Sequence, residues 1–588
     1  MVVFHLLCFL ILIVTAQCGS ADGLSTMGPC SVITKLFEGK EEACRCFPPG
    51  VGSGGLHMSD DGGENSTDYR SFASAPWIGC SRERMPAIYR ALAALPNNTR
   101  IQKLWIWDSL IPVVPQKFFG RLMVKNLILE SSHVGQFFPG VFKPFASHLR
   151  VLILKNNIIY RVDSELFEGL SKLKVLDLSG NQLSQIGASS FGSYFSSLKT
   201  LNLNHNNISS IREGAFRHLQ ELETLSMAFN ALTNLEMDSL SGLSNLKHLD
   251  LGRNRLEVIP VGAFDHLLHL ETLDVGSNRL KALQLPTLPN LMALFLHNNS
   301  LSRVEDISLH SPLYSVQSLY LDQNVITKLN EDQFIGFPKV KLLSLASNQL
   351  SQLHAATFRT SREIRVLSLQ RNRLTDLPSG VFAPLVNLSK LILSENNLTS
   401  LDEDTFAGVT SVSLLSVSHN RLRTVHRRAL VNFHMLEKLY LNDNQLQQLS
   451  NESLAQISDN LYLLDLSDNP WHCNCDALWL AKWIQDRQQI LSNSALTRCK
   501  ESSVQISSVM DDLIFHCEQT NDTYATMFGR YEKNDYWISV LGIILAIVSL
   551  LILAAIAFLF IQDGRLLRQY NELRRIPSDM VTLISSAK

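Results

Sequence analysis

The chain has 588 residues, of which 52 are Lys or Arg and 54 are Asp or Glu, so its formal net charge is −2 at pH 7. Charges of both signs are interspersed, so the sequence lacks the basic patch or stripe that marks a nucleic-acid-binding protein. No HExxH, G-x-S-x-G or P-loop pattern occurs, and we therefore expect no enzyme, no bound metal and no cofactor. The length allows several domains or one long array of repeats.

Residues 1–18 are expected to form a secretory signal peptide. An apolar run over residues 2–16 precedes "AQCGSADG", and this run is shorter than the roughly 20 residues that span a bilayer. The run begins with His5 nearby but without Lys or Arg, so a mature transmembrane helix is the alternative interpretation.

Residues 19–100 carry four cysteines, and we predict that they form an N-terminal cap. The cysteines are Cys30, Cys44, Cys46 and Cys80, and no cysteine occurs between Cys80 and Cys473. An even number of cysteines at each end of a secreted array suggests two disulfide-bonded caps. The insert between Cys46 and Cys80 is rich in Gly, Ser and Asp, which predicts a flexible loop and leaves the pairing open.

Residues 101–470 repeat the template L-x-x-L-x-L-x-x-N-x-L. Clear copies are "LKVLDLSGNQL" from Leu173 and "LKHLDLGRNRL" from Leu246. The copies begin at residues 101, 124, 149, 173, 198, 222, 246, 270, 291, 316, 340, 364, 388, 412, 436 and 461. One copy cannot bury its leucines alone, whereas stacked copies bury a continuous core. The pattern is the leucine-rich repeat signature, and it predicts an α/β solenoid, a horseshoe of about 16 repeats of about 24 residues.

Two other positions recur within the repeat. An Asn at the ninth position should satisfy the buried turn groups, and Ser109 and Ser132 take its place in the first two repeats. A Phe eighteen residues after most repeat starts should form a stacked spine: Phe142, Phe167, Phe191, Phe216, Phe264, Phe334, Phe358, Phe382 and Phe406. The eighth repeat has only 21 residues and lacks this Phe, so we predict a local change in curvature there.

Residues 471–517 follow the last repeat and begin "WHCNCDALWL". An amphipathic helix is expected over this stretch, with Leu480, Trp483 and Ile484 covering the open end of the core. The cysteines closely resemble the C-terminal cap of extracellular leucine-rich repeat proteins, and that resemblance implies the pairs Cys473–Cys499 and Cys475–Cys517. A zinc site is the less favoured alternative, because C-x-C is not the usual ligand spacing. The N-terminal cysteines resemble the matching cap, but the 33 residues between Cys46 and Cys80 depart from its compact spacing.

The segments after the cap predict a membrane anchor. Residues 518–536 are expected to be a stalk, and the uncharged segment 537–561 is expected to be a transmembrane helix. Four arginines follow it, namely Arg565, Arg568, Arg574 and Arg575, so the tail 562–588 should lie in the cytosol. Sequons for N-glycosylation occur only before this segment, at Asn65, Asn97, Asn207, Asn298, Asn387, Asn397, Asn451 and Asn521.

The tail contains two short sorting signals. "YNEL", from Tyr570 to Leu573, resembles a tyrosine-based sorting motif. "DMVTLI", with Asp579, Leu583 and Ile584, resembles an acidic dileucine motif. Together they suggest binding to clathrin adaptors and cycling through endosomes.

Ligand binding is expected on the concave face, because solenoids present many side chains to one partner there. Strand alternation directs Trp105, Trp107, Ile128 and Ile153 outward on three neighbouring strands. Phe295 and Tyr320 form a second outward pair, and exposed apolar clusters often mark interaction sites.

The chain from the signal peptide to the membrane resembles the superfamily of cell-surface leucine-rich repeat proteins, which includes Slit repeats, Toll-type ectodomains and chaoptin- and connectin-like adhesion proteins. The resemblance implies a single-pass type I plasma-membrane receptor or co-receptor for an extracellular protein or glycoprotein. Because the tail is too short for an effector domain, a signalling partner would have to supply one. Homophilic or heterophilic cell adhesion is the alternative function.

Overall fold

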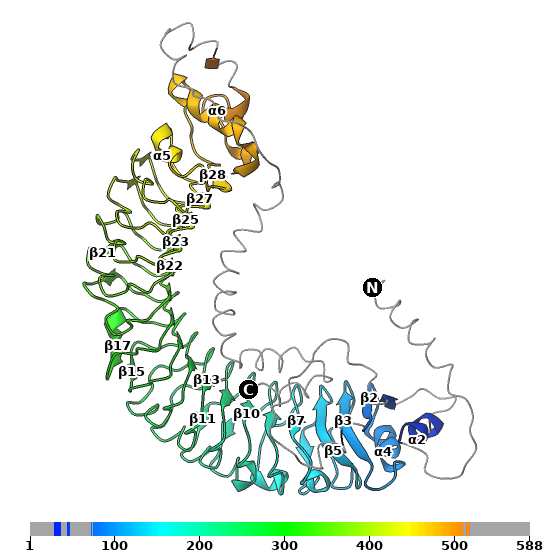
Figure 1. Ribbon diagram of the computed structural model, residues 1–588. Helices are drawn as coiled ribbons and strands as arrows, with labels where there is room; N and C mark the ends of the chain where they lie inside the picture. Colours follow the sequence, from blue (N-terminus) through cyan, green and yellow to red (C-terminus); the bar gives the residue numbers. More distant parts are fainter. Residues whose placement is uncertain are drawn as a thin grey trace.

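The computed structural model describes residues 29–36, 44–47, 72, 75–509, 513–514 and 517. The expected signal peptide, stalk, apolar segment 537–561 and tail with its sorting motifs lie outside these residues. Among the helices of the described part, none is long and apolar enough to cross a membrane. The described residues form one curved array with a cap at each end (Figure 1).

A single sheet of 19 strands lines the inner side of the curve (Figure 1). The first two strands pair antiparallel and belong to the N-terminal cap. The later strands pair parallel, one from each repeat, except that the last strand, Leu491–Ser492, comes from the C-terminal cap. In order across the sheet they are β1 Cys44–Phe47, β2 Trp77–Ser81, β3 Arg100–Trp107, β5 Met123–Glu130, β7 Val151–Ile153, β8 Val175–Asp177, β10 Thr200–Asn202, β12 Thr224–Ser226, β13 His248–Asp250, β14 Thr272–Asp274, β16 Ala293–Phe295, β18 Ser318–Tyr320, β20 Leu342–Ser344, β22 Val366–Ser368, β23 Lys390–Ile392, β25 Leu414–Ser416, β27 Lys438–Tyr440, β28 Leu463–Asp465 and β29 Leu491–Ser492.

Short parallel strand pairs lie on the outer side, where Figure 1 labels β15, β17 and β21. They are β4 Val113–Val114 with β6 Gln136–Phe137, β9 Gln185–Ile186 with β11 Ser210–Ile211, β15 Leu283–Leu285 with β17 Ile307–Leu309, β19 Lys328–Leu329 with β21 Gln352–Leu353, and β24 Ser400–Leu401 with β26 Thr424–Val425. The chain therefore rises along the inner sheet and returns along an outer side with little regular structure. This is the leucine-rich repeat horseshoe that the sequence predicts.

The core between the two sides is built from the repeated leucines and phenylalanines. In the sixth repeat Leu222, Leu225 and Met227 are fully buried. All nine predicted spine phenylalanines are buried as well, and neighbours stack, for example Phe334 on Phe358 with ring centroids 5.9 Å apart. Burying each such ring contributes about 1.5–3 kcal/mol to stability, so the spine fastens the outer side to the sheet.

The recurring Asn ties each repeat to the one before it. Nδ2 of Asn278 donates to the carbonyl oxygens of Val275, in its own repeat, and of Leu251, one repeat earlier, both at 3.0 Å. Its Oδ1 accepts the N–H of Leu256 at 2.9 Å. In the second repeat Ser132 Oγ instead accepts one bond, from the N–H of Ser109 at 3.3 Å. The predicted ladder of buried Asn side chains is confirmed, and Ser132 makes fewer of its bonds between repeats.

The short eighth repeat keeps the strand register of its neighbours. Thr272 of β14 is paired with Ala293 of β16, and Leu273 with Leu294, as in a repeat of normal length. The repeat is therefore shortened on the outer side, where β15 pairs with β17 over three residues and the buried Leu288 stands at the position that Phe occupies in most other repeats. The predicted change in curvature stays a prediction.

Both ends of the array are closed by disulfide-bonded caps. At the N-terminal end the bonds are Cys30–Cys46 and Cys44–Cys80, and helices α2 Pro29–Leu36 and α4 Met85–Ala93 flank the first strands. At the other end they are Cys473–Cys499 and Cys475–Cys517, the pairs implied by the resemblance. Helix α6 Leu478–Asp486 buries Leu480, Trp483 and Ile484 against the core, as predicted. A short helix, α5 Asn451–Ala455, precedes this cap.

Candidate functional site

The inner face of the sheet carries two apolar clusters that are separate from the leucine core. Within each strand the fourth residue of the repeat enters the core, while the third and fifth residues lie on the opposite face. One cluster is at the N-terminal end of the array, and we call it the tryptophan patch: Trp105, Trp107, Ile128, Val151, Ile153 and Val175. The other lies further along the sheet, and we call it the tyrosine patch: Phe295, Tyr320, Leu342 and Val366.

The tryptophan patch spans β3, β5, β7 and β8. The rings of Trp105 and Trp107 stack with centroids 3.8 Å apart, and Trp105 packs against the aliphatic side chains of the next strands. Ile128 lies opposite Ile153 in the register of the sheet. The structure therefore brings all four residues predicted for this site to the same part of the inner face.

The expectation that these side chains are exposed is wrong for two of them. Ile128 and Ile153 are 0% and 2% exposed, while Trp105 and Trp107 are half-buried. Parallel strands lie about 4.8 Å apart, so Val151 and Val175, at the third position of their repeats, pack beside the isoleucines. Neither valine was predicted as part of this site. The signal that could have identified both is a β-branched residue at the third position of the repeat, which lies on the same face as the fifth.

Lys103 lies beside the tryptophan patch on β3. Its Nζ is 4.8 Å from the ring centroid of Trp77 and 5.0 Å from that of Trp105, so the amine lies close to two indole rings. Burial lowers the pKa of Lys103 to about 6, and the nearby Glu130 opposes this shift. Glu130 also forms an ion pair with Lys155, at 2.9 Å. Burial thus favours the neutral form of this amine.

The tyrosine patch is built around one aromatic pair. The rings of Phe295 and Tyr320 lie 4.7 Å apart and almost parallel, with an interplanar angle of 8°. Leu342 and Val366 extend the patch over the next two strands. The expected exposure of Tyr320 is also wrong, because its side chain is 7% exposed and its hydroxyl has no hydrogen-bond partner among the described residues. Burial raises the pKa of this hydroxyl above its usual range.

Polar residues separate the two patches. Asp250 Oδ1 accepts the N–H of Gly252 at 2.9 Å, and Asp274 Oδ1 accepts the N–H of Gly276 at 2.8 Å. Burial raises the pKa of Asp274 to about 6, although the bond from Gly276 opposes the shift. These carboxylates therefore stabilise the turn that follows each strand, in addition to lying on the inner face.

A stacked group of side chains in the turns that follow the strands was not predicted from the sequence. In all sixteen repeats the residue before the ladder position has a positive φ, between 49° and 66°. Phe229 occupies this place in the sixth repeat, with φ 56°, and such a backbone is uncommon for a bulky residue. Its ring stacks on His205 at 4.1 Å, and the Arg253 guanidinium lies 4.8 Å from its centroid.

The described sequons lie at the surface. Asn97, Asn207, Asn298, Asn387 and Asn451 are exposed and Asn397 is half-buried, whereas Asn65 and Asn521 lie outside the described residues. Asn298 follows Phe295 by three residues, and its Nδ2 donates to Ser277 Oγ at 3.1 Å. A glycan there would lie on the edge next to the tyrosine patch.

Comparisons with known proteins agree with this architecture. The family model described as "Leucine rich repeat" matches overlapping segments that together cover residues 123–285 and 289–446, more than half of the chain. P-granule-associated novel protein 1 of Caenorhabditis elegans is 31% identical over 97 residues, which are 16% of this chain and 16% of that protein. Immunoglobulin superfamily member 10 of Mus musculus is 35% identical over 69 residues, 12% of this chain and 2% of that protein. The chain thus spans a small part of the curated relatives that it matches.

Solved structures share the fold. A leucine-rich repeat protein of Leptospira interrogans is similar with a TM-score of 0.51 and 26% identity, over 64% of this chain and 93% of that chain. A chain of the glycosylated Toll–Spatzle complex of Drosophila has a TM-score of 0.54 and 20% identity, over 79% of this chain and 75% of that chain. Folds of this kind are typically non-enzymatic scaffolds for protein interactions.

Proposed function

The chain belongs to the leucine-rich repeat family, and on that premise we propose that it is a single-pass type I protein of the plasma membrane that binds a protein or glycoprotein with the inner face of its array. It acts as a receptor or co-receptor, and a partner supplies the cytosolic effector. Its short tail binds clathrin adaptors through Tyr570 with Leu573 and through Asp579 with Leu583 and Ile584. The tail thereby sets how long the protein stays at the surface.

One observation carries the proposal: two aromatic-containing patches lie on the inner face, away from the leucine core. Aromatic side chains dominate binding energy in protein interfaces, because they bury a large area at a low cost in conformational entropy. The polar residues between the patches match the mixed character of such an interface. A partner that spans the curve would contact both patches with extended polar contacts in between.

The two ends of the array support the extracellular placement. Two disulfides close each cap, and disulfides persist in oxidising compartments. The similar Toll chain was solved in a complex with the protein Spatzle, so this fold is able to present a protein-binding surface.

The proposal is tested with the full chain in cultured cells. An antibody against a tag at residue 19 should stain intact cells, and one against the C terminus should stain only after permeabilisation. Ligand candidates are then applied to cells that express the wild type or a variant with Trp105→Ala and Trp107→Ala. The proposal is contradicted if the antibody against the C terminus stains intact cells, or if the wild type and the double variant bind ligand equally well.

Cell adhesion is the second candidate function, because an aromatic face on a long array also suits contact between cells. Suspended cells that express the full chain would cluster without added ligand if the protein is a homophilic adhesion protein. Mixing them with cells that lack the protein distinguishes heterophilic adhesion. A receptor produces neither kind of cluster.

A further inference from the structure

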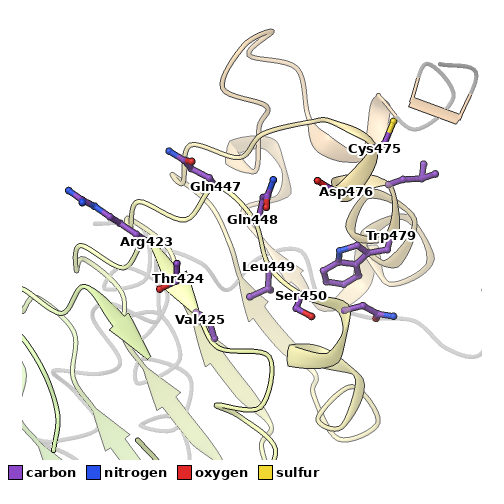
Figure 2. Close-up of a pocket in the computed structure, with 12 residues that line it drawn as sticks. Arg423, Thr424, Val425, Gln447, Gln448, Leu449, Ser450, Cys475, Asp476 and Trp479 are labelled. Carbon is purple, nitrogen blue, oxygen red and sulfur yellow. The ribbon is translucent and has the colours of Figure 1, made fainter. Parts of the chain in front are cut away.

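The C-terminal cap leaves a hollow where it meets the last repeats. The hollow has a volume of about 640 Å³, which is within the range of about 300–1,000 Å³ that is usual for ligand pockets. Thr424 and Val425 of β26 and the segment 447–451 line it on the array side. Asp476 and Trp479 line it on the cap side, and Figure 2 shows these two facing Gln448 and Ser450.

The lining combines one aromatic surface with several planar polar groups. Trp479 packs against the leucine core but is only half-buried, so part of its ring contributes to the wall of the hollow. The amides of Gln447 and Gln448 and the carboxylate of Asp476 also line the hollow. A sugar ring matches this chemistry, because its C–H face packs on an aromatic ring while its hydroxyls bond to amides and carboxylates. An apolar ligand would leave those polar groups without partners.

An N-glycosylation sequon lies at the same hollow. Asn451, which also lines it, is the exposed first residue of α5 and the acceptor of the sequon Asn451-Glu452-Ser453. Among the described residues no hydrogen bond involves the Asn451 side-chain amide. Ser453 is buried, which is no obstacle, because the oligosaccharide is transferred to the chain before it folds.

We propose that an N-linked glycan on Asn451 lays its first sugars in this hollow, against Trp479, and so joins the fifteenth repeat to the C-terminal cap. Attachment replaces one Nδ2–H bond by a bond from Nδ2 to C1 of the first N-acetylglucosamine. The donor is a polyprenyl-diphosphate oligosaccharide, whose diphosphate leaves with the bonding electrons, and a base of the transferase takes the Nδ2 proton. The inference rests on the proposed passage of the chain through the secretory pathway.

The test uses the full chain, expressed in animal cells and purified in detergent. Mass spectrometry of its glycopeptides gives the occupancy of each sequon, and treatment of the native protein with peptide N-glycosidase gives the rate of glycan release. Asn387 is the matched control, because it is an exposed sequon on an earlier repeat and does not line the hollow. We expect Asn451 to be occupied and its glycan to be released at least about tenfold more slowly than that on Asn387.

Two variants test whether the hollow is what protects the Asn451 glycan against release. Trp479→Ala and, separately, Gln448→Ala should speed release at Asn451 and leave release at Asn387 unchanged. An unmodified Asn451 in a chain that carries a glycan on Asn387 overturns the inference and leaves the proposed function standing. Equal release rates at the two sites in the wild type overturn it as well. A chain without any glycan overturns both the inference and the secretory placement.

Discussion

Asn254 donates a hydrogen bond from Nδ2 to the carbonyl oxygen of Met227, one repeat earlier, at 2.9 Å. The same nitrogen donates to Leu251 of its own repeat at 3.0 Å, and Oδ1 accepts the N–H of Leu232 at 3.1 Å. One buried side chain therefore satisfies backbone groups of two successive turns. Repeated along the array, this contact holds neighbouring strands in register, and it thereby positions the side chains of the inner face.

Asn254→Ala should destabilise the array by about 1–3 kcal/mol, because it leaves buried backbone groups unpaired. The midpoint of urea unfolding measures the effect. Lys281→Ala, at an exposed position, is the control and should change the midpoint little. Asp250 is unsuitable as a control, because its carboxylate accepts the N–H of Gly252. Equal midpoints for the Asn254 and Lys281 variants would contradict the ladder account.

The combined variant Trp105→Ala and Trp107→Ala should weaken ligand binding at least about tenfold, as expected when an aromatic hot spot is removed. Surface level and disulfide content report on folding, since Trp105 also packs against the inner-face cluster. A variant that is retained inside the cell would show that the two rings mainly stabilise the fold. Binding at wild-type strength would remove the tryptophan patch from the site.

Lys103→Met should flatten the dependence of stability on pH. Burial lowers the pKa of Lys103 to about 6 in the folded chain, against 10.5 for a free lysine. Between these values the unfolded chain binds one more proton, so the free energy of unfolding of the wild type rises with pH. Methionine keeps the volume and removes the titrating group. Urea midpoints at pH 6.5 and 9 measure the two slopes, and identical slopes would show that Lys103 is charged in the folded protein.

Replacing Tyr570 and both Leu583 and Ile584 by alanine should raise the surface level and slow the uptake of a surface-bound antibody. The arginines next to the expected membrane span should hold part of the tail at anionic lipid, at about 1 kcal/mol each. The dileucine segment lies beyond them, so its replacement should have the larger effect. Unchanged uptake in the combined variant would mean that the tail only anchors the chain.

The repeat, its core and its caps could be predicted because each depends on a strong periodic signal. Leucine spacing, the ladder Asn and the spine Phe recur at fixed positions, and burial allows few other residues there. The positive φ before the ladder position could not be predicted, because residues as different as Phe229, Arg253 and Gln323 occupy it. The burial of Ile128 and Tyr320 was also missed, since it depends on side chains that neighbouring repeats place beside them.

The most direct test of the central claim is photo-crosslinking from the two sides of the array on intact cells. A photoreactive residue replaces either Lys390 of β23, beside Val366 of the tyrosine patch, or Gln352 of β21 on the outer side. The account predicts that an extracellular partner crosslinks to the variant at position 390 and not to the variant at position 352. Crosslinking from position 352 alone, or with equal yield from both, would contradict binding at the inner face.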